Sequence, residues 1–497
     1  MDALTLNLLM VIGVIIFFLV QGISYFGRVN NAESFFLYGR SLESPEYSKS
    51  FAAASTSLAS VLFFFVTLGV QNGIYIFIAP ITYIIGCFLY CKLLLPRLDK
   101  QGFFLNNNTS SVATLGTTLG NYIETRYQSK SVKYSVIYIT FLGLLSILLI
   151  ELFVGVTIFS CYLKEVYVDF ALLIITIVVF VYTSMGGLVA VVKTDKVQFK
   201  LMLVASLMFM GWLIFKAIAK NDLPGMDDLI VRPIFSKEGF LLPYPIFFNI
   251  LIVNLFLIPA LLRTWQLAAS SPTAKSVKNG IMRGIYLTTL LTTLFIFIGI
   301  FFFKNVFPSS EMSLNGMLTS LHQSKEFFPS FIVFPLFFSA CVAALVSTAD
   351  SSLIPILQSL YQDFNTANNN EWKHRNIVLL TLILLVIALV LYFVVFRILK
   401  FNLMSWLFTI FSLLIIATPS IVWAVIAPDN IVSKKSSKVG AIISLHGSAI
   451  IAITLSIIGN KTGRLEIVQL NSPIAAMFGV FCFFIVFLYE KSRRSSK

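Results

Sequence analysis

Charged residues are scarce in this sequence. Only 12% of the 497 residues are Asp, Glu, Lys or Arg, whereas a soluble domain carries about 25%. The chain also has only three histidines and five cysteines, and they form no cluster with the spacing of metal ligands. These scarcities exclude a water-soluble protein and give no indication of a Cys/His metal centre or of an acid–base enzyme site.

Apolar residues make up 58% of the chain, and the mean hydropathy is +0.90. They fall in runs of about 20 residues, long enough to cross a hydrocarbon core of about 30 Å. A helix satisfies its own backbone hydrogen bonds in lipid, and the runs lack the alternation of barrel strands. We therefore expect an all-α polytopic membrane protein. The thirteen predicted spans are residues 4–26, 50–70, 74–95, 134–162, 169–192, 197–215, 243–262, 284–303, 327–361, 376–396, 403–427, 439–459 and 471–489.

The net charge of +14 could suggest a nucleic-acid partner. Most of the 36 Lys and Arg, however, fall in alternate loops and in the C-terminal tail. This is the positive-inside bias, which orients a membrane protein. The sequence thus predicts a multi-pass inner-membrane protein in the lipid bilayer, with its N-terminus outside, its C-terminus in the cytoplasm and no nucleic-acid partner.

Two of the predicted spans, the second and the ninth, are rich in small and hydroxyl residues. Such stripes can mean close helix packing, or they can supply the oxygen ligands that a hard cation such as sodium prefers. Local unwinding of the second span near Ala54 would add free carbonyls to such a site. The stripe on the second span is Ala53, Thr56, Ser57 and Ser60, and that on the ninth is Ala344, Ser347, Thr348 and Ser351.

Four segments resemble motifs of the sodium:solute symporter family, in that family's order. They are VYTSMGGLVAVVKTDKVQ (181–198), AALVSTADS (343–351), TLGNYIETRY (118–127) and LAAS with AKSVKNGI (267–281). The resemblance implies a LeuT-type fold of two inverted five-helix repeats. The repeats would occupy residues 50–220 and 243–427, with flanking helices in 1–49 and 438–497.

The same resemblance implies the ion-binding residues. A sodium site would use the carbonyl oxygens of Ala54, Ser57 and Ala344 and the hydroxyls of Ser347 and Thr348. Asp195 matches an aspartate near the family's cytoplasmic ion path. Asp350 and Ser351 fall where some members bind a second sodium ion, together with that aspartate.

Glu151 lies in the middle of an apolar span, where a charge costs at least about 2.5–3.5 kcal/mol. Two interpretations stay open. The carboxylate hydrogen-bonds another helix, or it faces the central cavity and attracts an amine of the solute. Sialic-acid-transporting relatives have an arginine at a matching position, so the second interpretation favours a cationic or zwitterionic solute. Thr56 and Asn254 are further candidates for the solute site, and Arg263 is expected at the cytoplasmic face.

The resulting prediction is sodium-coupled uptake of a small organic solute, such as an amino acid or amine, by alternating access. Two alternatives remain. A proton-coupled carrier is possible because Asp195, Asp350 and Glu151 can bind protons. A membrane sensor with a transporter-like core is the other.

Overall fold

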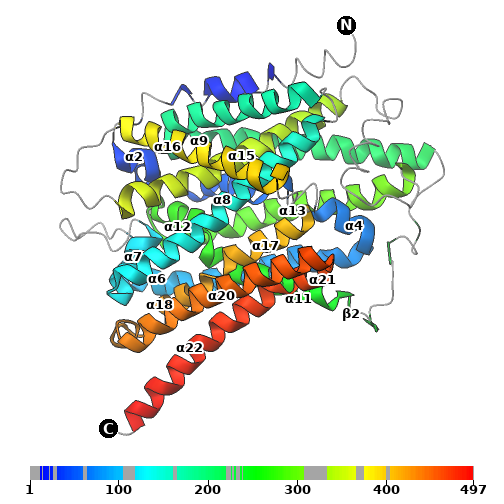
Figure 1. Cartoon of the computed structure of the whole chain (residues 1–497). Coiled ribbons are helices and arrows are strands. Elements are labelled where there is room, and N and C mark those ends of the chain that lie inside the picture. The colour runs from blue at the N-terminus through cyan, green and yellow to red at the C-terminus, as the bar shows by residue number, and fades with distance from the viewer. Residues whose placement is uncertain are drawn as a thin grey trace.

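The computed structural model describes residues 12–495, with gaps, and its described part is almost entirely helical (Figure 1). The gaps are residues 14, 22, 26–28, 30, 60–63, 105–117, 161–164, 220–224, 226–228, 231–234, 238, 307–332, 365–373 and 399–402. The strands in this part are three two-residue segments of one antiparallel sheet, β1 (Phe235–Ser236), β2 (Gly239–Phe240) and β3 (Leu242–Pro243).

The helices of the first half follow one another as short and long segments. They are α2 (Ala32–Leu37), α3 (Ser44–Ser55), α4 (Val66–Asn72), α5 (Ile78–Leu89), α6 (Leu95–Lys100), α7 (Leu119–Tyr127), α8 (Lys130–Ser160) and α9 (Glu165–Ala219). Short 3-10 and π segments join several of them: η2 (Tyr38–Arg40), η4 (Gly73–Phe77) and η5 (Tyr90–Leu94).

The second half begins after the small sheet. Its helices are α11 (Tyr244–Ala260), α12 (Leu262–Ala269), α13 (Ala274–Val306), α15 (Val333–Asp363), α16 (His374–Tyr392), η7 (Phe393–Ile398), α17 (Leu403–Ile415), α18 (Thr418–Ile426) and α19 (Asp429–Val432). The C-terminal helices are α20 (Lys435–Thr462), α21 (Leu465–Gln469) and α22 (Asn471–Ser495).

Ten helical stretches of the described residues are long and apolar enough to cross a membrane, so the polytopic all-α prediction is confirmed, whereas the count of thirteen spans is not. Of the three other predicted spans, 4–26 is described only in part, because residues 4–11, 14, 22 and 26 lie outside the described residues. The span 50–70 is interrupted after Ser55 and includes the gap at 60–63. The span 169–192 runs without a loop into the next one, as the first part of α9.

The Gly-Gly pair of the 181–198 motif bends α9 without ending it. Gly187 has φ 54° and ψ −150° inside the helix, a conformation that only glycine adopts readily. A Cβ atom at this position would lie 2.6 Å from the carbonyl oxygen of Phe35 in α2. The Gly-Gly pair of the motif thus forms a kink against which α2 packs.

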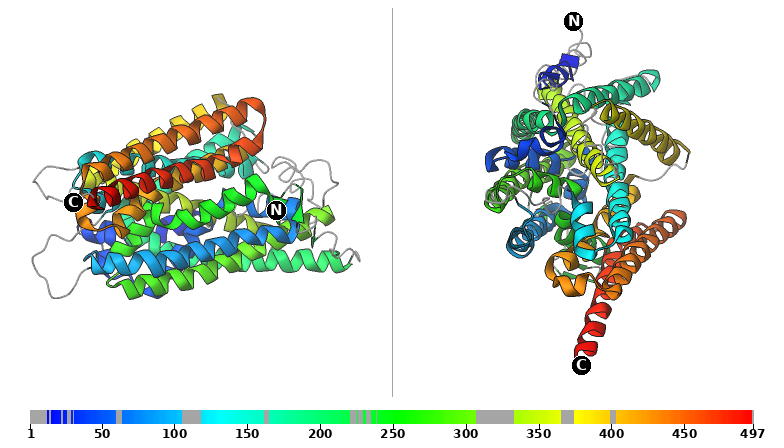
Figure 2. Two further views of the ribbon diagram at one scale, coloured as in Figure 1. Left: turned by 90° about the horizontal axis from the view of Figure 1, so that it is seen from below. Right: turned by 90° about the vertical axis from the view of Figure 1, so that its left-hand side faces the viewer.

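Helix α15 forms the centre of the bundle. Its apolar stretch is entirely buried within the protein, and it packs against α9, α8 and α3. Helices α20 and α22 lie together at one side, and α22 extends beyond the body of the molecule (Figures 1 and 2). A helix that never meets lipid has no need for a fully apolar surface, so α15 can carry Ser347, Thr348 and Asp350.

Candidate functional site

Helix α3 breaks in the middle of the molecule. It ends at Ser55, and the following residue, Thr56, has φ −108° and ψ 67°. The Thr56 hydroxyl donates to the carbonyl of Ala52 at 2.7 Å, and its amide donates to that of Ala53 at 3.2 Å. Helical structure resumes at Leu58. The unwinding that the sequence suggested near Ala54 therefore lies at Thr56 and Ser57.

Glu151 of α8 binds the backbone just beyond this break. Its Oε2 accepts the amide of Leu58 at 3.1 Å, and its Oε1 accepts the amide of Ala59 at 3.3 Å. The hydroxyl of Ser57 makes a further hydrogen bond with the carboxylate. Glu151 is fully buried and is not among the described residues that line the cavity beside the break.

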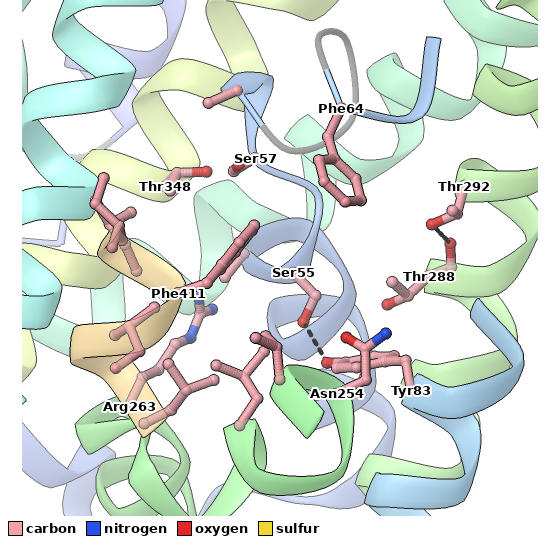
Figure 3. Close-up of a pocket in the computed structure, with 18 of the residues that line it drawn as sticks. Ser55, Ser57, Phe64, Tyr83, Asn254, Arg263, Thr288, Thr292, Thr348 and Phe411 are labelled. Atoms are coloured by element: carbon pink, nitrogen blue, oxygen red, sulfur yellow. Dashed lines mark hydrogen bonds between the residues drawn. The ribbon is translucent and has the colours of Figure 1, made fainter. Parts of the chain in front are cut away.

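That cavity has a volume of about 190 Å³ and lies between α3, α5, α8, α11, α12, α13, α15 and α17 (Figure 3). Its walls are mostly apolar, with hydroxyl, amide and one guanidinium group among them, and no acidic side chain among the described lining residues. The polar lining residues are Ser55, Ser57, Tyr83, Asn249, Asn254, Arg263, Thr264, Thr288, Thr289, Thr292, Thr348, Ser351 and Ser352.

Two polar contacts join helices across this cavity. The hydroxyls of Ser55 and Tyr83 lie 3.2 Å apart and connect α3 with α5 (Figure 3). Asn254 of α11 donates to the Ala79 carbonyl and to the Thr82 hydroxyl, both at 2.9 Å. Asn254, a solute candidate by sequence, thus lines the cavity but has its amide nitrogen bound to α5.

The predicted sodium residues divide between two neighbouring cavities. Ala54, Ser57 and Thr348 line the cavity of Figure 3, where Ser57 and Thr348 lie at the same end. Ser57 also lines a small second cavity, of about 20 Å³, together with Thr56 and Ala344. The structure therefore brings the break in α3 and the hydroxyl face of α15 together. The groups that could coordinate an ion there are carbonyl and hydroxyl oxygens, which fit a hard cation such as sodium.

Ser347 points away from this group and binds Asp195 of α9. Its hydroxyl donates to Oδ1 of Asp195 at 2.5 Å. The hydroxyl of Ser50 donates to Oδ2 at 2.5 Å, and Nη2 of Arg263 lies 3.2 Å from the same oxygen. Asp195 is fully buried, so its charge is balanced by Arg263 within the protein.

Asp350 and Ser351, the other predicted members of a second ion site, lie next to each other on α15. The Ser351 hydroxyl donates to Oδ1 of Asp350 at 3.1 Å. The Thr348 hydroxyl donates to the Ala344 carbonyl of its own helix at 3.0 Å. Ser351 also lines the main cavity, one helical turn from Thr348.

Arg263 is a cavity residue that sequence reasoning did not include among the site candidates. It was expected at the cytoplasmic face, and in the structure it lines the cavity, where Nη2 also donates to the Ser50 carbonyl at 2.6 Å. Its Nη1 is buried without a hydrogen-bond partner among the described residues. The available signal was Pro259, because a proline four residues before an arginine at the end of an apolar run marks a helix break.

The chain does break there. Helix α11 ends at Ala260, Leu261 is extended with φ −73° and ψ 112°, and α12 starts at Leu262. The indole of Trp265 donates to the carbonyl of Pro259 at 2.7 Å, which satisfies one acceptor that the break exposes. Two interrupted helices, α3 and α11, thus face the same cavity from different halves of the chain.

Comparisons with known proteins agree with this architecture. A Na+-coupled sialic acid symporter, solved in a substrate-bound outward-open state, is similar over 96% of this chain and 97% of its own, with 14% identity and a TM-score of 0.69. MhsT in complex with L-phenylalanine is similar over 88% of this chain and 97% of its own, with 14% identity and a TM-score of 0.57.

A manganese transporter from Eremococcus coleocola is similar over 93% of this chain and 96% of its own, with 14% identity and a TM-score of 0.55. At these identities the likeness shows the fold, which is of the LeuT type, and not the substrate. No curated protein sequence matches the chain. The sodium:solute symporter family matches residues 35–448, most of the chain. On this match, and on the geometry above, the chain belongs to the sodium:solute symporter family.

Proposed function

We propose that this protein couples the entry of sodium to the uptake of a small organic solute. The observation that supports this is the meeting of the break in α3 with the hydroxyl face of α15, beside a cavity whose mostly apolar walls carry several hydroxyl and amide groups. Family membership supports sodium as the coupling ion and a small molecule as the solute. Sodium is a transported substrate here, and the protein performs no covalent chemistry on either cargo.

The sodium site consists of the carbonyls of Ala54, Ser57 and Ala344 with the hydroxyl of Thr348. Ser347 joins this shell while its hydroxyl still donates to Asp195, since the lone pairs of its oxygen remain able to bind a cation. Asp195, with Asp350 and Ser351 on the adjacent α15, forms the route by which sodium leaves. Bound sodium would hold α3 against α15 and so raise the affinity for the solute; coupling of about 1–3 kcal/mol is ordinary.

The solute is small, and it is neutral or zwitterionic. The cavity of about 190 Å³ is smaller than the roughly 300–1,000 Å³ that drug-sized ligands occupy. Its hydroxyl and amide groups favour a hydrogen-bonding solute with an apolar part. A cationic solute is disfavoured because Glu151, the carboxylate that motivated it, has both oxygens on backbone amides. Asn254, the Thr56 segment and Nη1 of Arg263 remain candidates for contact with the solute.

Uptake into proteoliposomes tests the proposal. Zwitterionic amino acids, neutral amides, amines and organic acids are each offered at fixed pH under a sodium, potassium or proton gradient. We expect accumulation of a neutral or zwitterionic solute with sodium alone. Thr348→Val should raise the sodium concentration for half-maximal uptake at least about tenfold, equivalent to about 1.4 kcal/mol. Thr381→Val, a control on α16 whose buried hydroxyl donates to the Ile377 carbonyl at 2.7 Å, should change it little.

Two results would contradict the proposal. Accumulation driven by a proton gradient without sodium would favour the proton-coupled alternative, for which Asp195, Asp350 and Glu151 are the available carriers. Solute binding without accumulation under any gradient would favour a sensor.

A further inference from the structure

Glu151 is a fully buried carboxylate to which the proposed transport cycle gives no role. The two amides that it accepts belong to Leu58 and Ala59. In a continuous helix each amide donates to the carbonyl four residues earlier. The amide of Leu58 would therefore bind the carbonyl of Ala54, and that of Ala59 the carbonyl of Ser55.

The carboxylate thus replaces the two acceptors that an unbroken helix would use. Because the amides are turned to Glu151, the carbonyls of Ala54 and Ser55 do not receive them. The carbonyl of Ala54 is one of the oxygens in the proposed sodium site. We propose that Glu151 is a positioning residue for sodium: it holds α3 open and so keeps the Ala54 carbonyl available to the ion. This inference rests on the proposed sodium site.

Charge makes a carboxylate well suited to this task. Two backbone amides at the start of a helical segment offer partial positive charge, and a carboxylate accepts from both at once. The third hydrogen bond, with Ser57, ties the carboxylate to the unwound residue itself. An amide side chain at position 151 offers one acceptor oxygen, and its NH2 group would face a second N–H donor.

The proposal assigns Glu151 to the ion and not to the solute. The helix that carries it, α8, supplies apolar residues to the solute cavity, among them Leu144, Ile147 and Ile150. The carboxylate itself reaches past them to residues 58 and 59. Loss of its charge should therefore alter sodium binding even when no solute is present.

The test is a sodium titration of the purified protein without solute, with choline replacing sodium to hold the ionic strength constant. Sodium-dependent change in tryptophan fluorescence or melting temperature reports binding. We expect Glu151→Gln to raise the half-saturating sodium concentration at least tenfold. Glu151→Asp keeps both carboxylate oxygens, but its side chain is shorter by one methylene group. We expect it to raise the half-saturating sodium concentration at least threefold.

Thr140→Val is the matched control, because Thr140 is also buried on α8, and its hydroxyl donates, among the described residues, to the carbonyls of Val136 and Ile137 in its own helix, at 2.8 and 3.1 Å. We expect it to lower the melting temperature slightly without moving the sodium midpoint. A merely structural Glu151 would behave like Thr140, with melting lowered equally at low and saturating sodium.

A sodium midpoint within twofold of the wild type in Glu151→Gln would overturn the proposal. If that variant does not fold, an unchanged midpoint in Glu151→Asp has the same force. A wild-type protein that shows no response to sodium would instead overturn the proposed function and this inference with it. The two failures are thus distinguished by the wild-type titration.

Discussion

At the scale of single residues, the buried pair of Asp195 and Arg263 makes the sharpest energetic prediction. Removing one partner of a buried ion pair leaves the other charge without compensation, at a cost of about 3–5 kcal/mol. We expect Asp195→Asn and Arg263→Gln each to lower the melting temperature strongly. The double variant should melt above the less stable single variant, because neither charge is then left alone.

Glu33 and Arg40 provide the control for this comparison of single and double variants. They form an ion pair at 2.8 Å, but the Glu33 side chain is 54% exposed, and such pairs contribute about 0–1 kcal/mol. Glu33→Gln should therefore shift the melting temperature little. Strictly additive effects of the Asp195 and Arg263 substitutions would show that the two side chains do not interact.

The sequence predicted some of these residues better than others. Ser57 and Thr348 were identifiable because hydroxyl residues stand out in an apolar span, and Ala54 followed from the family resemblance; all three line one cavity. The partners of Glu151 were not identifiable. They lie 93 and 92 residues away in the chain. They are backbone amides, which every residue except proline carries, so the residue types do not reveal them.

At the scale of elements, the kink in α9 depends on glycine. Gly187→Ala would place a Cβ atom at φ 54° and 2.6 Å from the Phe35 carbonyl, where both strain and contact oppose it. Backbone with positive φ and ψ near −150° costs a non-glycine residue about 1–3 kcal/mol, and the clash adds to this. We expect a clear fall in melting temperature and weaker packing of α2, measured as faster amide hydrogen exchange in residues 32–37.

Gly211→Ala is the matched substitution in the same helix. Its Cβ atom would meet nothing within 4 Å, and alanine is favoured over glycine inside a helix by about 0.8–1.0 kcal/mol. We expect unchanged or higher stability. If both substitutions changed the melting temperature to the same extent, the positive-φ conformation of Gly187 would not be required for the kink.

The spans themselves were predictable because a lipid-crossing helix must be long and apolar. Where the prediction differed, the reason is local. The spans 169–192 and 197–215 were separated by polar residues, but those residues continue one helix that only kinks, and two of them, Thr194 and Asp195, are buried. The break in α3 was expected near Ala54. Its actual position depends on the hydrogen bonds of Thr56 and Glu151, which only the folded chain supplies.

At the scale of the whole molecule, α7 holds the two halves of the chain together. Arg126 donates to the carbonyls of Ala424 and Ala427 at 2.7 and 2.8 Å, at the end of α18. It also pairs with Asp429. Because hydrogen bonds with a charged partner contribute about 1.5–3 kcal/mol each, we expect Arg126→Gln to lower the melting temperature and to speed hydrogen exchange in residues 424–429.

Arg97→Gln is the control for this contact, since the Arg97 side chain is exposed and donates to the carbonyl of Leu93, four residues earlier in the chain, at 2.6 Å. Its removal should affect neither measurement appreciably. Unchanged exchange at the end of α18 in Arg126→Gln would mean that α7 does not restrain the second half.

The balanced charges of Asp195 and Arg263 also bear on the driving force. If this pair contributes no net charge to the moving core and the solute is neutral or zwitterionic, each sodium ion carries one uncompensated charge inward. A charge that crosses the bilayer gains about 2.3 kcal/mol per 100 mV of membrane potential. Uptake would then be electrogenic, and an interior-negative voltage would drive it even where sodium concentrations on the two sides are equal.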